Sequence, residues 1–236
     1  MEVSPDSTVI WSWGFAHINL TLLYTWGVMA LLTFFAWLAT RKLSIGPVLS
    51  RWQNFFESVI VLAQRHIRDI IGMEPQRYLP FLATLFLFIS LSNLLIVVPG
   101  VHPPTGSLST TAALALCVFF AVPAYSIAER GVRGYLKHYV HPSPLMLPFH
   151  VIGELTRTLT LAVRLFGSIM SEFMIAAALL AIIPFLLPVV MKLFGLLIGQ
   201  IQAYIFAVLA TIYIASAVTA GEQARDHTSG KEASNG

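Results

Sequence analysis

Arg164 lies inside one of the most apolar parts of the chain, the stretch LTLAVRLFGSIMSEFM from Leu159 to Met174. At the centre of a membrane-spanning helix an arginine costs roughly 2.5–3.5 kcal/mol on insertion scales, and ionisable residues at that depth by default mark ion paths and counter-ions. The plainer alternative is that the guanidinium satisfies a neighbouring helix or extends to the headgroups. Either this segment lies outside a membrane, or Arg164 has a function within one.

Further polar residues share the predicted helix with Arg164. Arg157 lies seven residues earlier on the same face, Ser168 continues that face, and Glu172 lies about 80° around the helix. Glu172 is also about 12 Å along the axis from Arg164, which is too far for a simple ion pair. We therefore expect the counter-ion of Arg164 to come from another subunit, and we take all four residues as candidates for ion translocation.

Three more polar positions are candidates for the same ion path. Glu154 precedes Arg157 by three residues, a spacing that favours a local ion pair, although Arg157 also lies near enough to one end to extend to the headgroups. Asn93 either lines an aqueous entrance or packs between helices. Gln202 lies in the last apolar segment, where an amide at mid-membrane must find hydrogen-bond partners.

Composition places these residues in a membrane. Of the 236 residues, 57% are hydrophobic and 11% are charged, whereas an average soluble domain is about 25% charged. The segments 7–40, 78–128 and 193–221 contain no Asp, Glu, Lys or Arg, and a spanning helix needs only about 20 apolar residues. The net charge of +3 is spread through loops, without the clustered basic face that nucleic-acid binding would need.

Hydrophobic patterning predicts the helices that must position the candidate residues. Five spans are expected, at about 20–38, 78–98, 108–128, 148–183 and 188–221, and segment 48–71 has the three-to-four spacing of an amphipathic helix on the membrane surface. The last two spans have about 35 residues each, or about 50 Å of helix, against about 30 Å of hydrocarbon. They must therefore tilt steeply, kink or extend beyond the lipid. The fold class is all-α, with one membrane domain over 1–221 and a disordered tail over 222–236.

The distribution of lysine and arginine predicts the orientation. Eleven basic residues can all lie on one side, whereas residues 1–19 and the turn around 99–106 have none; the eleven are Arg41, Lys42, Arg51, Arg65, Arg68, Arg77, Arg130, Arg133, Lys137, Arg225 and Lys231. The positive-inside rule then places the N-terminus outside and the C-terminus in the cytoplasm, which requires an odd number of crossings. The N-terminus has no basic n-region, so we expect the first span to be retained rather than cleaved.

Other motifs for chemistry are weak. His138 and His141 have H-x-x-H spacing but no nearby third ligand, and the chain contains neither H-E-x-x-H nor G-x-x-x-x-G-K. Gly195 and Gly199, four residues apart, predict close helix packing. We therefore expect no catalytic residue, no metal site and no cofactor.

The quoted motifs together resemble subunit a of the rotary ATP synthases, the stator of the membrane sector. The matching stretches cover nearly the whole chain before Glu222. They are RWQNFFESV (Arg51–Val59), SNLLIVVPG (Ser92–Gly100), GSLSTTAALAL (Gly106–Leu116), IGELTRTLTLAVRLFGSIM (Ile152–Met170) and IQAYIFAVLATIYIASA (Ile201–Ala217).

This resemblance implies a non-catalytic, ion-translocating subunit of a bacterial inner-membrane complex. Its five spans would include two long, steeply tilted helices against a ring of c subunits, with peripheral-stalk b subunits, the soluble ATPase sector and the bilayer as further partners. The essential arginine of the family falls on Arg164 and its glutamine on Gln202. Two offset half-channels would carry protons or sodium ions to and from the ring carboxylates.

Three positions depart from the pattern of the family. The channel acid or histidine usually found nine residues after the arginine is Phe173 here, with Glu172 one residue earlier. The polar position seven residues before the glutamine is Gly195, and the position four after the arginine, often asparagine, is Ser168. The chemistry of the outer half-channel is therefore the open part of the prediction.

Two other classes of function remain as alternatives. A self-contained channel or transporter should show inverted repeats, and no internal repeat is visible in the sequence. A membrane-embedded hydrolase or transferase using His138, His141 and Glu154 would need a nucleophile or a metal triad, which these residues do not complete.

Overall fold

The computed structural model describes residues 9–13, 16–40, 51–72, 74–97, 103–140, 147–182 and 186–234. Six helices carry the fold: α1 (Leu20–Thr40), α2 (Arg51–Ile71), α3 (Leu79–Leu94), α4 (Leu108–Val140), α5 (Leu147–Ile182) and α6 (Leu186–Ser234). Short 3₁₀ turns lie at η2 (Pro75–Arg77), η3 (Leu95–Val97) and η4 (Pro104–Gly106). Ahead of α1, strands β1 (Val9–Trp13) and β2 (Ala16–Asn19) pair antiparallel in a small hairpin that the sequence patterns did not predict.

Within the described residues, four helices contain segments long and apolar enough to cross a membrane. These segments are Thr21–Leu38, Leu108–Glu129, Ile152–Leu180 and Val189–Val218. The apolar helix α3 has 16 residues, or about 24 Å at 1.5 Å per residue, which is less than the thickness of the hydrocarbon. The predicted helical membrane protein with multiple crossings is confirmed, and the crossing by α3 stays a prediction.

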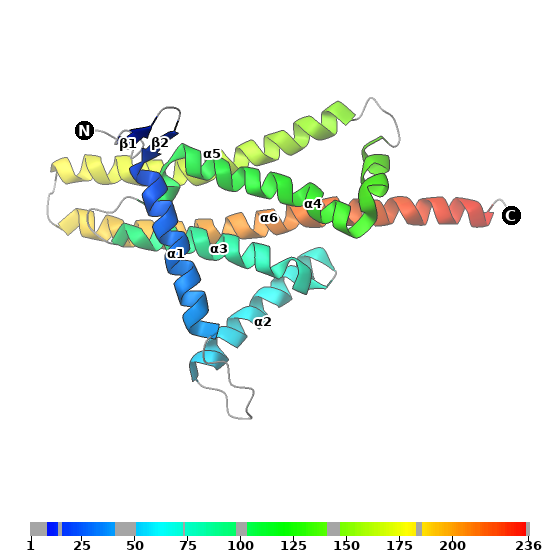
Figure 1. The fold of residues 1–236 in the computed structure, drawn as a ribbon, viewed down its shortest axis with the longest axis horizontal. Coiled ribbons are helices and arrows are strands. Elements are labelled where there is room, and N and C mark those ends of the chain that lie inside the picture. The colour runs from blue at the N-terminus through cyan, green and yellow to red at the C-terminus, as the bar shows by residue number, and fades with distance from the viewer. Residues whose placement is uncertain are drawn as a thin grey trace.

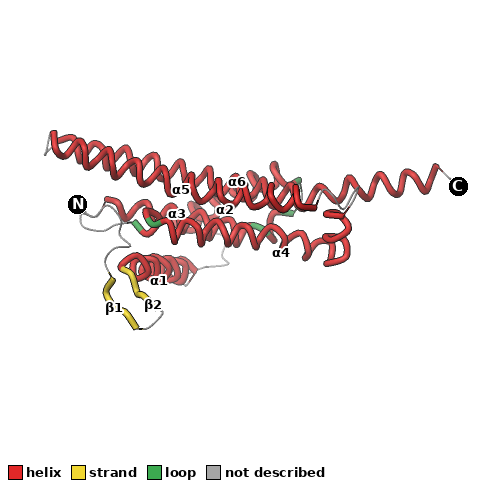
Figure 2. Tube along the Cα trace, turned by 90° about the horizontal axis from the view of Figure 1, so that it is seen from above, coloured by secondary structure: helices red, strands yellow, loops and turns green. Residues whose placement is uncertain are grey.

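Most of the helices form one long bundle, which is built in layers. Helices α3, α4, α5 and α6 run along the long axis, with α5 and α6 antiparallel, while α1 crosses them steeply (Figure 1). Seen from above, α5 and α6 form one side, α3 and α4 form the middle, and α1 with the hairpin lies on the other side (Figure 2). The two longest helices therefore present one outer face of the molecule.

The core lies where α3, α4, α5 and α6 meet. Its fully buried side chains include Ile89 of α3, Val118 of α4, Leu161 and Leu165 of α5, and Phe206, Ala210 and Ile214 of α6. Small residues such as Ala203 and Ala210 let neighbouring helices approach α6 closely. On the opposite face of α5, Leu155, Leu159 and Val163 are exposed at four-residue spacing. This apolar face is available to lipid or to another membrane protein.

Two helices, α4 and α6, continue beyond the predicted spans. Helix α4 contains a kink at Gly131, whose φ of 72° and ψ of 162° are not helical, and the last part of α4 runs in a different direction from its first part (Figure 1). A positive φ is readily adopted only by glycine, so Gly131 ends the membrane-crossing part of α4 close to the predicted boundary at 128. Helix α6 continues to Ser234, through most of the segment 222–236 for which the composition predicted a disordered tail.

Candidate functional site

Arg164 projects from the middle of α5 on the exposed apolar face. Its side chain is exposed, as are the neighbouring Val163 and Leu159. Among the residues that the structure describes, the only ion pair joins Arg77 to Glu129, so Arg164 has no carboxylate partner within the described part of the chain. The expectation that its counter-ion belongs to another subunit stays a prediction. Ser168, one turn further on, donates its hydroxyl to the carbonyl of Leu165 at 3.0 Å.

Arg157 binds α6 instead of pairing with Glu154. Its Nη1 donates to the hydroxyl of Ser216 at 3.3 Å, and its guanidinium carbon lies 5.0 Å from the centre of the Tyr213 ring. A cation above an aromatic face is attracted by the quadrupole of the ring. Arg157 therefore joins α5 to α6 near the end where Glu154 is half-buried, and the two arginines of α5 have different surroundings.

Gln202 lies on α6 with a side chain only 8% exposed. Its Nε2 is buried and has no hydrogen-bond partner in the described structure, as is also true of the Ser92 hydroxyl on α3. A buried donor without an acceptor is expensive, by roughly 1–3 kcal/mol. A residue kept in such a state is a candidate for a function that needs a free polar group.

Asn93 joins three elements through both ends of its amide. Its Nδ2 donates to the carbonyl of Gly199 on α6 at 2.7 Å, and its Oδ1 accepts a hydrogen bond from the hydroxyl of Thr105 in η4 at 3.1 Å. One turn earlier on α3, the Ser90 hydroxyl donates to Oε1 of Gln200, and Nε2 of Gln200 returns a bond to the Ser90 carbonyl at 3.0 Å. Asn93 thus takes part in a polar seam between α3 and α6, which consists of Ser90, Asn93, Thr105, Gly199 and Gln200.

The sequence analysis missed Ser90, Thr105 and Gln200 as partners in this seam. A signal existed, because Ser90 lies one turn before Asn93 and Gln200 lies next to Gly199. The pairing itself depends on α3 facing α6, and these helices are separated by about a hundred residues of chain. The spacing of residues along one helix does not show which other helix it packs against.

Replacing Asn93 with leucine should destabilise the protein. The substitution leaves the Thr105 hydroxyl without its acceptor and the Gly199 carbonyl without its donor, so we expect the free energy of unfolding to fall by about 1–2 kcal/mol. Thermal unfolding of the detergent-solubilised protein measures this change. Thr33→Val is the matched control, because the exposed Thr33 hydroxyl bonds only within α1. Equal melting temperatures for Asn93→Leu and the control would contradict the role of the seam.

Glu172 reaches from α5 to the backbone of α6. Its side chain is half-buried, and its carboxylate lies over Gly195, so that a Cβ placed on Gly195 would overlap it. The next residue, Phe173, packs its ring against η4, where its Cε2 would lie 3.2 Å from a Cβ on Gly106. Of the predicted site residues, the structure therefore brings Arg157, Glu172 and Asn93 against α6, the helix that also carries Gln202.

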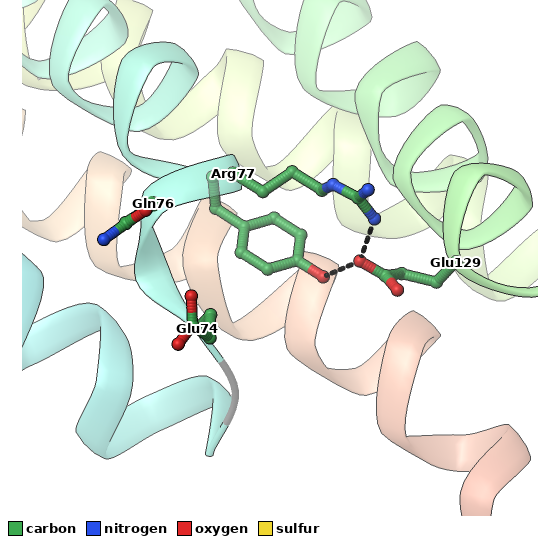
Figure 3. Close-up of a pocket in the computed structure, with 5 residues that line it drawn as sticks. Glu74, Gln76, Arg77 and Glu129 are labelled. Carbon is green, nitrogen blue, oxygen red and sulfur yellow. Dashed lines mark hydrogen bonds and ion pairs between the residues drawn. The ribbon is translucent and has the colours of Figure 1, made fainter.

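A second polar cluster joins the start of α3 to α4, away from Arg164. A cavity of about 560 Å³ is lined by Glu74, Gln76, Arg77, Tyr78 and Glu129 (Figure 3). Arg77 and the Tyr78 hydroxyl both donate to Oε1 of Glu129, the hydroxyl at 3.2 Å. Burial, and then the charge of Glu129, raise the pKa of Tyr78 to about 12, so this hydroxyl remains a donor at neutral pH. The exposed pair is worth roughly 0–1 kcal/mol and holds two helix ends together.

Metal-binding residues are not clustered in the described part of the chain. No group of three or more His, Cys, Asp or Glu side chains there could hold a metal ion. The H-x-x-H pair falls outside this statement, because the side chain of His138 and the whole of His141 lie outside the described residues.

Comparison with known proteins gives a family and several relatives. The family described as ATP synthase A chain matches residues 22–215. ATP synthase subunit a 1 of Chlorobaculum parvum is 55% identical over 223 residues, which cover 94% of this chain and 99% of the relative. ATP synthase subunit a 2 of Picosynechococcus sp. is also 55% identical, over 94% of this chain and 96% of its own. ATP synthase subunit a of Nitrosospira multiformis is 53% identical, over 93% and 87%.

Proposed function

The chain belongs to the ATP synthase A chain family, and from this premise we propose that it carries ions between the two sides of the membrane and the rotating ring. Family membership makes it a membrane-sector subunit that takes part in ATP synthesis and ion transport and is not itself catalytic. Two half-channels, one open to each side, would let protons or sodium ions reach and leave the carboxylates of the c-subunit ring.

The observation that carries this proposal is Arg164, which is exposed on the apolar face of α5 and has no ion-pair partner among the described residues. A ring carboxylate passing at about 4 Å would gain roughly 4 kcal/mol at an effective dielectric near 20. This attraction favours the ionised carboxylate and releases the bound ion. A potential of 100 mV supplies about 2.3 kcal/mol per elementary charge, and the guanidinium keeps its own proton throughout.

The proposed placement in the membrane follows from the crossing of α1. Helix α1 meets the layer of α3 to α6 at a steep angle (Figure 1), so α1 and this layer cannot both stand along the membrane normal, and we propose that α5 and α6 are steeply tilted. Such a tilt accommodates the 36 residues of α5, or about 54 Å of helix. We propose five crossings, with α3 extended by η3 as the second. Helix α2 would lie on the membrane surface as an interfacial helix, the N-terminus outside and the C-terminus in the cytoplasm.

The outer face of α5 and α6 is proposed as the surface for the c-subunit ring. Its exposed apolar side chains include Leu155 and Leu159 of α5 and Leu197 and Ile201 of α6. Peripheral-stalk b subunits and, through the complex, the soluble ATPase sector complete the proposed set of partners.

Purification of the tagged chain from its native membrane tests the proposal. We expect a multi-copy hairpin protein and soluble ATPase subunits to co-purify, and vesicles holding this complex to make ATP when an ion gradient is imposed. A stable, solitary chain that transports ions by itself would overturn the proposal in favour of a self-contained transporter.

Replacing Gln202 with leucine should slow coupled turnover without abolishing it. Leucine keeps most of the buried volume and removes the Nε2 donor, which has no hydrogen-bond partner among the described residues, while the charge of Arg164 remains. The measurement is the rate of ion-driven ATP synthesis in vesicles, with Gln76→Leu as a control for loss of an exposed amide elsewhere. A wild-type rate for Gln202→Leu would refute the assignment.

A further inference from the structure

The cavity beside Arg77 lies between two helix ends. Gly72 follows α2 with a φ of 73°, which glycine adopts without steric cost, and after this turn η2 brings Arg77 to the start of α3. On the opposite wall, Glu129 lies two residues before the kink of α4 at Gly131. Both walls are therefore built where an apolar helix begins or where its straight part ends.

The position of the cavity along these helices places it at the edge of the hydrocarbon. The candidate membrane span of α4 runs from Leu108 to Glu129, so its last residue lines the cavity. The apolar helix α3 begins at Leu79, directly after the cavity-lining Tyr78. The ring centres of Tyr78 and Tyr125 are 5.1 Å apart, and tyrosine is enriched at the level of the lipid headgroups. Headgroups are therefore the small polar groups that lie nearest to the cavity.

The charged groups of the cavity leave donors and acceptors unused. Arg77 donates through Nη1 and Tyr78 through its hydroxyl, both to Oε1 of Glu129. Among the described residues, neither Oε2 of Glu129 nor the carboxylate of Glu74 has a hydrogen-bond or ion-pair partner. A guanidinium carries five N–H donors, so Arg77 keeps several for a ligand. The cavity thus offers a cationic donor together with two carboxylate acceptors (Figure 3).

Charge and size favour a ligand that carries a phosphate and a primary amine close together. A guanidinium binds phosphate through two parallel N–H bonds, and the free carboxylate oxygens accept from an ammonium group. A lone anion would be repelled, because Glu74 and Glu129 outnumber Arg77, the one cation of the lining. Phosphoethanolamine carries both charges on one short chain. The cavity volume of about 560 Å³ is within the range of about 300–1,000 Å³ for small-molecule sites.

Apolar surface for acyl chains lies on both walls of the cavity. The side chains of Leu87 on α3 and Phe120 on α4 are 50% and 65% exposed. Each lies nine or ten residues into the apolar helix from the cavity, or about 15 Å at 1.5 Å per residue. A lipid with its headgroup in the cavity can therefore lay its chains along α3 or α4.

We propose that this cavity binds the phosphoethanolamine headgroup of a membrane lipid, with the phosphate on Arg77 and the ammonium group on Glu74 and Glu129. The bound lipid holds the start of α3 to the end of α4, where the exposed Arg77–Glu129 pair by itself contributes little. The site is separate from Arg164 and from the ion path. The inference therefore needs only a membrane protein and does not depend on the proposed function.

Competition between lipids tests the headgroup chemistry. The delipidated chain in detergent is mixed with equal amounts of phosphatidylethanolamine, phosphatidylcholine and phosphatidylglycerol, and native mass spectrometry identifies the bound lipid. Phosphatidylcholine has no N–H on its ammonium group, and phosphatidylglycerol has no ammonium group. We expect phosphatidylethanolamine to be retained at least about fivefold over each of the others, since hydrogen bonds between charged groups are the strong ones. O-Phosphoethanolamine, which has no acyl chains, is tested in parallel.

Substitutions of the same shape test the acceptors. Glu74→Gln and Glu129→Gln remove the charges, while position 129 keeps an oxygen that can accept from Arg77 and Tyr78. We expect the double variant to retain phosphatidylethanolamine and phosphatidylcholine about equally. Glu57→Gln on α2 is the matched control, because this exposed carboxylate does not line the cavity, and it should keep the wild-type ratio. Arg77→Gln removes the phosphate donor and should lower phosphatidylethanolamine retention at least about threefold.

The wild-type comparison decides the matter without any variant. Retention of phosphatidylcholine or phosphatidylglycerol as strongly as phosphatidylethanolamine would overturn the inference. So would a wild-type ratio in the double variant, or full retention by Arg77→Gln. Binding of O-phosphoethanolamine without binding of the lipid would assign the cavity to a soluble ligand instead. If the double variant keeps its lipid ratio but loses a subunit from the complex, the carboxylates bind a basic side chain of that subunit and the lipid proposal fails.

Discussion

Replacing Arg164 with alanine should abolish ATP synthesis and ion-pumping ATP hydrolysis in complexes that still assemble. Assembly should survive because the Arg164 side chain is exposed and has no ion-pair partner in the described structure. Activity should be lost because, under the proposed function, the positive charge discharges the arriving ring carboxylate and blocks a direct ion path between the two half-channels. Without the charge, a carboxylate would lose roughly 4 kcal/mol of attraction at about 4 Å.

Arg164→Lys should also fail or nearly fail, although it conserves the formal charge. A desolvated lysine loses its proton readily and lacks the planar fork of the guanidinium, which can bind both oxygens of a carboxylate. The measurement for both variants is ATP synthesis and potential-driven ion flux in vesicles holding the assembled complex. We expect passive ion leakage through Arg164→Ala when a potential is imposed.

Arg68→Ala on the exposed face of α2 is the matched control for loss of an arginine, and it should leave both rates unchanged. If Arg164→Ala made ATP at a substantial fraction of the wild-type rate, the mechanism assigned to it would be wrong. Arg157 would then be the next candidate, but its contacts with Tyr213 and Ser216 make it less free to meet a passing carboxylate.

The sequence predicted the long helices well because their signal is local. Span 148–183 corresponds to α5 at Leu147–Ile182, and span 20–38 corresponds to α1 at Leu20–Thr40. Charge-free apolar length is a property of a segment by itself. The kink at Gly131 and the β1–β2 hairpin were not predicted, because the kink depends on the backbone angles of one residue and the hairpin depends on the pairing of two short segments.

The candidate site shows the same difference between residues that one segment identifies by itself and residues whose surroundings depend on another helix. Arg164 and Gln202 were identified because a charge or an amide is chemically out of place in an apolar run, and this can be seen without knowing the fold. The environments of Glu172 and Asn93 could not be predicted, because each is defined by a facing helix. The local ion pair expected for Glu154 and Arg157 was replaced by contacts to α6 for this reason.

Replacing Gly199 with leucine should prevent α3 from packing on α6 and remove the protein from the membrane complex. The space beside Gly199 is already filled, because a Cβ alone would lie 3.0 Å from the Cβ of Asn93. A leucine side chain would push α3 away and break the 2.7 Å bond from Asn93 to the Gly199 carbonyl. Overpacking in a rigid interior typically costs about 1–3 kcal/mol, and more where backbone must move.

The amount of assembled complex in membranes, measured by co-purification with the ring subunit, tests this expectation. Gly27→Leu on α1 adds the same side chain where a Cβ has nothing within 4 Å, and it should assemble normally. Gly199→Ala adds one methyl group and should lower the yield only in part, because Asn93 must shift by a few tenths of an ångström. Normal assembly of Gly199→Leu would mean that α3 does not lie against α6 in the complex. Asn93, Gln200 and Ser90 would then have to satisfy their polar groups by contacts with other subunits.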